Sequence, residues 1–115
     1  MKKVVISLGS MVIIIAACSK SSTGMVTSPD CSGSAKLFAT DVNPVIQSSC
    51  ASNAGCHASG SSNGPGALIT YQQIFNARFS IRSAVANGNM PLNSSLSVSQ
   101  KNAILCWVDN GATNN

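Results

Sequence analysis

The five cysteines of this 115-residue chain limit its possible folds more than any other feature. The first of them, Cys18, directly follows an apolar run that begins after Lys2 and Lys3, which is the pattern of an export signal. Removing residues 1–17 from the 115 leaves 98 residues, enough for one small domain with a thin core. Exported domains of this size usually rely on disulfides, a metal or a cofactor for stability.

The end of the apolar run, residues 15–18 (IAAC), resembles a lipobox, in which a cysteine is lipidated before the signal is cleaved. We therefore predict a lipoprotein signal peptide over residues 1–17 and a lipid on Cys18 at the mature N-terminus. The run is too short to serve comfortably as a permanent membrane anchor. Lipidation would hold the chain in the cell envelope of a bacterium, at the periplasmic face of a membrane, in the outer membrane or at the cell surface. The alternative is ordinary cleavage near Ala16 or Ala17, which would leave a free thiol.

The charge of the mature chain is small. Loss of Lys2 and Lys3 lowers the formal net charge from +4 to +2, and no basic patch suggests nucleic-acid binding. Residues 18–35 are rich in Ser, Thr and Gly without an apolar period, so they are predicted to form a flexible tether. The folded domain is expected over residues 36–115.

Apolar spacing in this domain predicts helices and no strands. The expected helices lie at about 43–49, from Thr70 through the following apolar positions, at 80–87, and after Ser97. Pro44 fits a first helical turn, Ser97 with Gln100 forms a capping-box pattern, and Gly88 and Gly111 are natural stop residues. The prediction is a small all-α domain of three to four short helices with long loops.

Four cysteines remain when Cys18 is assigned to lipid: Cys31, Cys50, Cys56 and Cys106. Four cysteines allow three pairings, and the sequence does not choose among them. One pair stands out because the chain's only histidine, His57, directly follows Cys56.

The segment from Cys50 to His57, CASNAGCH, is related to C-x-x-C-H, the attachment signature of c-type haem, but has five residues between its cysteines instead of two. In such a site Cys50 and Cys56 form thioethers with the haem vinyl groups, and His57 binds the iron. The intervening residues are small or turn-prone, as a bulge requires. The alternative is a simple Cys50–Cys56 disulfide with a solvated His57.

From about Leu37 onward the chain resembles small lipoprotein members of the class I c-type cytochromes. The resemblance rests on the order of four segments: DVNPVIQSSC, CASNAGCH, NMPL and AILCWVDNGATNN. It implies a cytochrome c-like fold around haem c, with His57 and Met90 as axial iron ligands and a contact between Phe38 and Trp107. The alternative is that Met90 is a core methionine packed under a loop and does not bind the iron. With haem on the other two thiols, Cys31 and Cys106 would be the remaining disulfide pair.

The function expected from this resemblance is electron transfer by a membrane-anchored monohaem cytochrome, an electron carrier and not an enzyme, with redox proteins as donor and acceptor. One alternative is a disulfide-stabilised structural or adhesive lipoprotein without haem. Another is a haem enzyme or sensor with an open axial site, if Met90 does not bind the iron. Arg78 and Arg82 are candidates to neutralise haem propionates or are simply a solvated pair.

Overall fold

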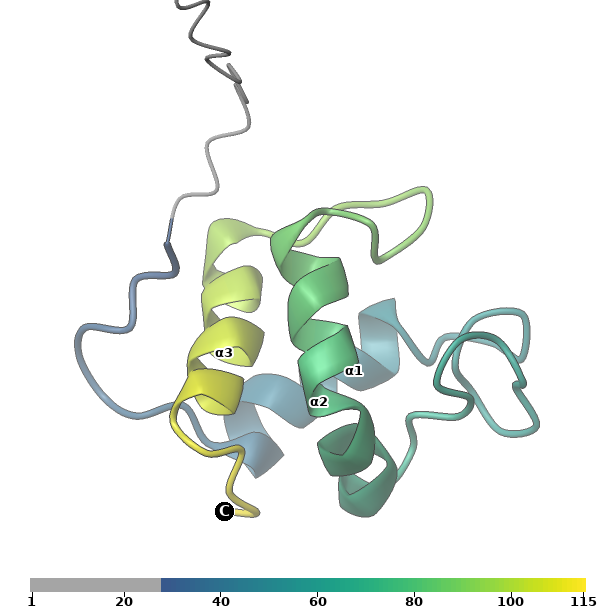
Figure 1. Ribbon diagram of the computed structural model, residues 1–115, viewed down its shortest axis with the longest axis horizontal. Helices are drawn as coiled ribbons and strands as arrows, with labels where there is room; N and C mark the ends of the chain where they lie inside the picture. The colour runs from purple at the N-terminus through teal and green to yellow at the C-terminus, as the bar shows by residue number, and fades with distance from the viewer. Residues whose placement is uncertain (1–27) are drawn as a thin grey trace, which may run out of the picture.

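The computed structural model describes residues 28–115, which form three α-helices and one short π-helix, with no strand among them. In chain order the elements are η1 (Phe38–Val42), α1 (Asn43–Ser49), α2 (Tyr71–Ala86) and α3 (Val98–Asp109). Helices α2 and α3 pack side by side and run in opposite directions, and η1 contacts both α1 and α3 (Figure 1). The predicted all-α class is therefore confirmed.

The predicted signal peptide and Cys18 lie outside the described residues, as does the predicted tether up to residue 27. Within residues 28–115, no helix combines the length and the apolar character needed to cross a membrane.

Local sequence signals fix the ends of the two long helices. Thr70 Oγ1 accepts a hydrogen bond from the Gln73 N–H, and Gln73 Oε1 accepts one from the Thr70 N–H, which completes a capping box. Ser97 and Gln100 form the same reciprocal pair at the start of α3. Gly111, just after the C-cap of α3, has a φ of +102°, a left-handed conformation that glycine adopts without a Cβ clash.

One predicted boundary is wrong. Residues 71–79 and 80–87 were expected to form two helices, but they belong to a single α2 that runs on to Ala86. No glycine or proline occurs in residues 71–86, and the side chains of Phe79 and Ser80 are both exposed. A serine on an exposed helical face costs only a few tenths of a kcal/mol relative to alanine, roughly, so the helix continues through it.

The hydrophobic core centres on Trp107, which is only 1% exposed. Its ring lies 5.5 Å from that of Phe38 between centroids, and Phe38 lies 5.0 Å from Tyr71 in an edge-on arrangement. The expected contact between Phe38 and Trp107 is thus present, although Phe38 lies in η1 rather than in α1. Six consecutive residues of α3, Ala103 to Val108, are buried.

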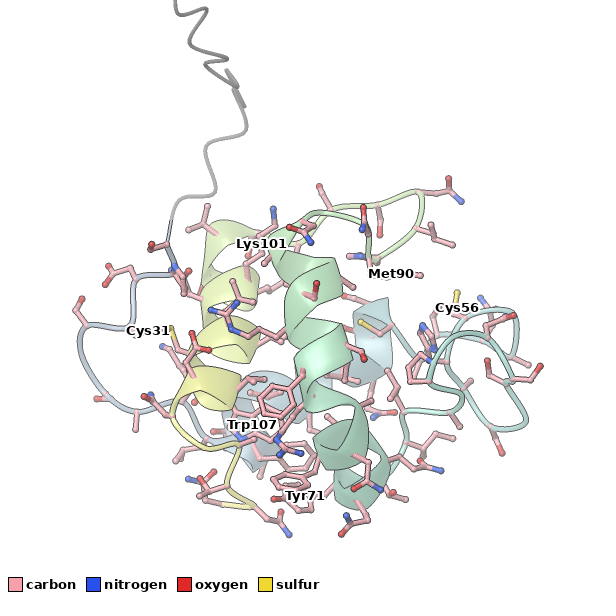
Figure 2. The ribbon with its side chains drawn as sticks, in the orientation of Figure 1. Cys31, Cys56, Tyr71, Met90, Lys101 and Trp107 are labelled. Carbon is pink, nitrogen blue, oxygen red and sulfur yellow. A yellow bond between two sulfur atoms is a disulfide. The ribbon has the colours of Figure 1, made fainter. Side chains whose placement is uncertain are left out.

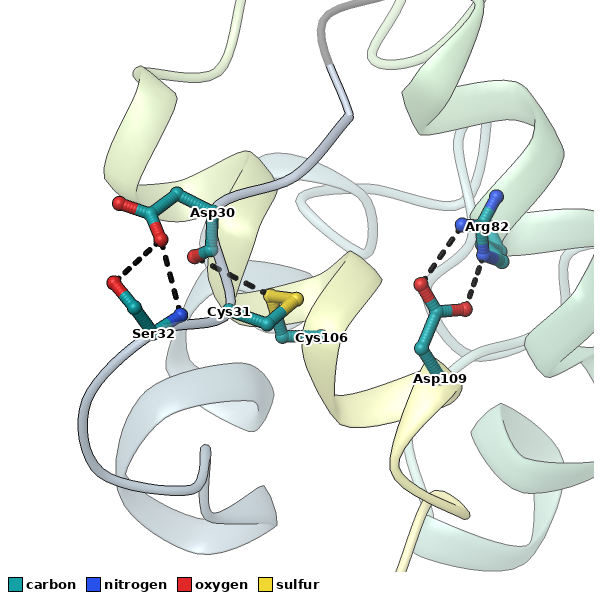
Figure 3. Close-up of a disulfide and its surroundings, with 6 residues drawn as sticks. All are labelled: Asp30, Cys31, Ser32, Arg82, Cys106 and Asp109. Carbon is teal, nitrogen blue, oxygen red and sulfur yellow. Dashed lines mark hydrogen bonds and ion pairs between the residues drawn. A yellow bond between two sulfur atoms is a disulfide. The ribbon is translucent and has the colours of Figure 1, made fainter.

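A disulfide between Cys31 and Cys106 fastens the segment before η1 to α3 (Figure 3). The two Cα atoms are 5.5 Å apart, and the bridge closes a loop over a sequence separation of 75. In the chain-entropy model a loop of this length contributes about 4 kcal/mol to stability. The pairing agrees with the one expected for a chain whose other two thiols are reserved for haem.

Candidate functional site

The candidate site lies in the loop between α1 and α2, residues 50–70, which we call the cysteine–histidine loop. Cys50 ends α1, and its N–H donates to the Ile46 carbonyl at 2.9 Å. The Cys50 carbonyl then accepts a hydrogen bond from the His57 N–H at 3.0 Å. Residues 51–56 therefore form a closed loop, which we call the excursion, and the backbone of His57 lies beside that of Cys50.

Cys50 and Cys56 are both free thiols, so the disulfide alternative for this pair is not formed among the described residues. Cys50 is buried within the hydrophobic core cluster, whereas Cys56 is partly exposed. Burial raises the pKa of the Cys50 thiol, and the neighbouring Cys56 thiol raises it further. Cys50 is thus a protonated thiol at neutral pH, in a domain that also holds the Cys31–Cys106 disulfide.

His57 is buried, and the position of its ring is fixed by the same loop. Its Nδ1 lies 2.9 Å from the Gly66 carbonyl oxygen, which can only accept a hydrogen bond, so Nδ1 carries the hydrogen. In the neutral ring the lone pair is then on Nε2. Nε2 makes no hydrogen bond within residues 28–115, and it is not fully enclosed, because no buried side-chain nitrogen or oxygen there lacks a partner. Nε2 therefore keeps a small exposed area, although His57 as a whole is only 7% exposed.

The backbone of Cys56 is held from both sides by polar side chains. Asn53 Oδ1 accepts hydrogen bonds from the N–H groups of Gly55 at 2.9 Å and Cys56 at 3.2 Å. On the other side the Ser61 hydroxyl donates to the Cys56 carbonyl, and the Asn63 side-chain amide donates to the Gly55 carbonyl at 2.8 Å. The sequence pattern predicted only a loop for these residues. The signal that was missed is the tendency of Asn and Ser side chains to bind nearby backbone groups.

Met90 lies in the second long loop, residues 87–97 between α2 and α3, which we call the methionine loop. Its N–H donates to the Ala84 carbonyl at 3.2 Å, which ties the start of this loop to the end of α2, and its side chain is partly buried. Figure 2 places Met90 and Cys56 on the same side of the molecule, across α2 from α3. No hydrogen bond joins Met90 to His57.

Most of the aromatic residues and arginines of α2 contact one another, α3 or the residues after α3. The Tyr71 hydroxyl donates to the Ala112 carbonyl at 2.9 Å, and Phe79 is 66% exposed. The Arg78 guanidinium stacks on Phe75 with its Cζ 3.9 Å from the ring centroid. Arg82 forms a bidentate ion pair with Asp109 (Figure 3). Of the two arginines considered for haem propionates, Arg82 therefore has a carboxylate partner already.

A hollow of about 350 Å³ lies between the cysteine–histidine loop and α2 and is open to solvent. It is lined by Pro65, Ala67, Gln73, Asn76, Ala77 and Ser80. Pro65 and Ala67 flank Gly66, the partner of His57, but half of the lining side chains are polar. The hollow is thus not the apolar slot that buries most of a porphyrin.

The donor groups of the site nevertheless fit a covalently attached haem. Cys50 and Cys56 are free thiols, and His57 directly follows the second of them. The imidazole has Nε2 available, while its Nδ1 is hydrogen-bonded to Gly66. No group of three or more His, Cys, Asp or Glu side chains within residues 28–115 is placed to hold a metal ion. A porphyrin brings four nitrogen ligands of its own, so the chain needs to supply only the axial positions.

Comparison of the chain with family models, with curated proteins and with solved structures found no match.

Proposed function

We propose that this chain is a monohaem c-type cytochrome that transfers electrons, with thioether bonds from haem c to Cys50 and Cys56 and with His57 as an axial ligand. One observation carries the proposal. A buried histidine with Nδ1 bound and Nε2 free follows directly after one unpaired thiol and is hydrogen-bonded to the residue bearing the other. The remaining described cysteines already form a disulfide, so this thiol pair is left for another use.

Each residue of the site has a separate task in this proposal. A haem held here supplies one-electron exchange between ferrous and ferric iron. The Gly66 carbonyl fixes the tautomer and the orientation of the His57 ring and raises the basicity of Nε2, as such partners do for metal-binding histidines. Cys50, at the end of α1, and Cys56, held by Asn53 and Ser61, would fix the porphyrin edge from two sides.

Met90 is the proposed second axial ligand. It is the only methionine among residues 28–115, and Figure 2 draws it on the same side of α2 as Cys56. A thioether opposite an imidazole raises the reduction potential of haem iron, which suits an electron carrier and closes the site to oxygen chemistry. The protein would then have no substrate reaction of its own.

The proposed setting is the bacterial cell envelope, with the chain anchored in a membrane through a lipid on Cys18. Partners would be redox proteins that dock briefly at the exposed haem edge, through interfaces at the small end of the usual range.

A disulfide-stabilised structural or adhesive lipoprotein without haem is the second candidate, and two observations favour it. The aromatic residues Phe38, Tyr71 and Trp107 pack on one another, and half of the side chains that line the hollow beside the cysteine–histidine loop are polar. Neither feature requires a cofactor.

A pyridine haemochrome spectrum separates these two candidates. The full chain is matured in a host with an active cytochrome c maturation system, beside the variant Cys50→Ala. We expect a two-thioether c-type band in the wild type and a band of the one-thioether form in the variant. Wild-type protein without covalent haem, with Cys50 and Cys56 joined by a disulfide, would overturn the cytochrome proposal in favour of the structural one.

Binding of carbon monoxide to the ferrous protein tests the role of Met90. The wild type is expected not to bind it, whereas Met90→Ala opens an axial position and should bind it. Leu92→Ala, an exposed position in the same loop, is the matched control and should behave as the wild type. Carbon monoxide binding by the wild type would instead indicate an open site, as in a haem enzyme or sensor.

A further inference from the structure

The five-residue separation of the cysteines raises a geometric problem that the loop itself answers. Cys50 is placed by α1, because its N–H closes the last helical turn on Ile46. Cys56 has no helix to place it. Its backbone position depends on the turn formed by residues 53–56 and on the hydrogen bonds that close this turn.

Asn53 is the centre of that turn. Its main-chain carbonyl accepts from the N–H groups of Cys56 at 3.0 Å and Ala58 at 3.1 Å, and its side-chain Oδ1 accepts from Gly55 and again from Cys56. The Cys56 N–H is therefore shared between two oxygens of one residue. Asn53 thus closes the turn that leads to Cys56 from its N-terminal side, while Ser61 and Asn63 bind the carbonyls of Cys56 and Gly55.

Gly55 permits this arrangement. A Cβ added to Gly55 would lie 3.1 Å from Asn53 Oδ1, which is closer than about nine in ten Cβ contacts in proteins. An alanine at this position would require the Asn53 side chain to shift by a few tenths of an ångström, which would disturb its hydrogen bonds to the two N–H groups. Asn53 and Gly55 thus act together, with the side chain of one occupying the space that the other leaves.

We propose that Asn53 is a positioning residue that places the Cys56 thiol for its thioether bond and so allows the two cysteines to stand five residues apart. This inference rests on the proposed haem attachment. The bond forms by addition: the Cys56 sulfur bonds to one carbon of a porphyrin vinyl group, and the thiol hydrogen goes to the other. No atom leaves, and nothing is oxidised or reduced. Cys50, held independently by α1, does not need Asn53.

The test compares Asn53→Ala with the wild type after a short, fixed maturation time. Peptide mass spectrometry reports which cysteine carries haem, and a pyridine haemochrome spectrum reports one thioether or two. For Asn53→Ala we expect the two-thioether fraction to fall by about tenfold, since misplacing one reacting group by an ångström has effects of this size or larger. The haem that remains should be linked through Cys50 alone, with Cys56 open to alkylation.

Three further variants make the result specific. Asn53→Asp keeps an oxygen acceptor at the same position and should restore two thioethers. Gly55→Ala should act in the direction of Asn53→Ala. Ser59→Ala, at an exposed position of the same loop whose side chain makes no hydrogen bond among the described residues, should match the wild type. Thermal melting of each apoprotein should stay unchanged, because the turn is exposed and lies outside the core.

The outcomes separate this inference from the proposed function. Two thioethers in both the wild type and Asn53→Ala would overturn the role of Asn53 and leave the cytochrome proposal standing. A wild type that carries one thioether also overturns the role of Asn53, because the turn then fails to place Cys56. A wild type without haem overturns both.

Discussion

The end of the molecule built on α3 and the end formed by the two long loops are held together by different interactions. Around α3, stability comes from six consecutive buried residues, stacked aromatic rings and the Cys31–Cys106 disulfide. The cysteine–histidine and methionine loops contain no Asp, Glu, Lys or Arg. The first of them is held by hydrogen bonds within its backbone and by others between its Asn and Ser side chains and the backbone. Stability is thus concentrated at one end, and the candidate chemistry at the other.

Trp107→Ala should produce the largest effect at the α3 end. The side chain is 1% exposed and contacts Phe38, and its Nε1 donates to the Thr113 carbonyl at 2.9 Å. We expect a loss of about 3–5 kcal/mol in the free energy of unfolding, as for other buried aromatic truncations. Urea denaturation followed by circular dichroism measures it, with the exposed Phe79→Ala as the control. Equal losses in both variants would mean that the core is not centred on Trp107.

Removing the disulfide is the next largest change. The double variant Cys31→Ser, Cys106→Ser leaves no unpaired partner thiol and should lose about 2–5 kcal/mol of unfolding free energy. Urea denaturation of the apoprotein again measures the loss, and Cys56→Ser serves as the control because that thiol is unpaired without haem. The double variant should still acquire covalent haem under conditions in which it is folded, below its urea unfolding midpoint. Loss of attachment in a folded double variant would show that the two ends are not independent.

The helix caps should have intermediate effects at both ends. Thr70→Ala removes the cap of α2 next to the loop, and Ser97→Ala removes that of α3. Each should lower the unfolding free energy by about 1 kcal/mol. Thermal melting compares them with Thr70→Ser and Ser97→Thr, which keep the hydroxyl and should retain most of the stability. A cap variant indistinguishable from the wild type would contradict the observed capping boxes.

The Arg82–Asp109 ion pair should have a smaller, pH-dependent effect. The hydrogen bonds from Arg82 lower the pKa of Asp109, so the pair stabilises the fold above the unfolded pKa of about 3.9 and this contribution is lost as the pH falls through the folded pKa. The two side chains are 35% and 38% exposed, and solvent screening limits the gain to about 1 kcal/mol or less. Asp109→Asn should therefore be less stable than the wild type at pH 7 and equal to it at strongly acidic pH. A difference that persists in acid would assign the effect to packing.

Ionic strength should have the smallest effect, on electron exchange at the loop end. Because neither loop carries a charged residue, the rate of oxidation of the haem protein by ferricyanide should change less than about twofold between about 0.01 and 0.1 M salt. Ser52→Lys, which adds a charge at an exposed loop position, should make the rate fall with added salt. A steep salt dependence in the wild type would place the exchange site near the charged residues of the α3 end.

The sequence predicted the helical end better than the loop end because the signals there are local. The hydroxyl and amide of each capping box lie three residues apart, and Gly111 acts within its own turn, so Thr70, Ser97 and Gly111 were all identified correctly. The break expected after Phe79 was wrong because serine is only a weak helix breaker. The π-helical turn η1 was not predicted, and neither were the contacts of the chain's last residues. Phe38 N–H donates to the Asn115 side chain, 77 residues away, and no local pattern encodes such a contact.

Within the candidate site, the residue types suggested which segment to consider, but the sequence did not predict how its side chains are placed. The adjacency of Cys56 and His57 identified the segment, and the pairing of Cys31 with Cys106 followed once the other two thiols were set aside. The Gly66 carbonyl that fixes His57 could not be found, because any of several loop carbonyls was available. Asn53 was noted only as turn-prone, since its role depends on how the excursion closes.

Peptide-level alkylation of the matured wild-type protein tests the central claim most directly. We expect one haem per chain, with Cys50 and Cys56 resistant to alkylation both before and after reduction. Cys31 and Cys106 should become reactive only after reduction. No haem, with Cys50 and Cys56 alkylated directly or after reduction, would contradict the claim that the loop end holds a covalent cofactor while the α3 end holds the fold.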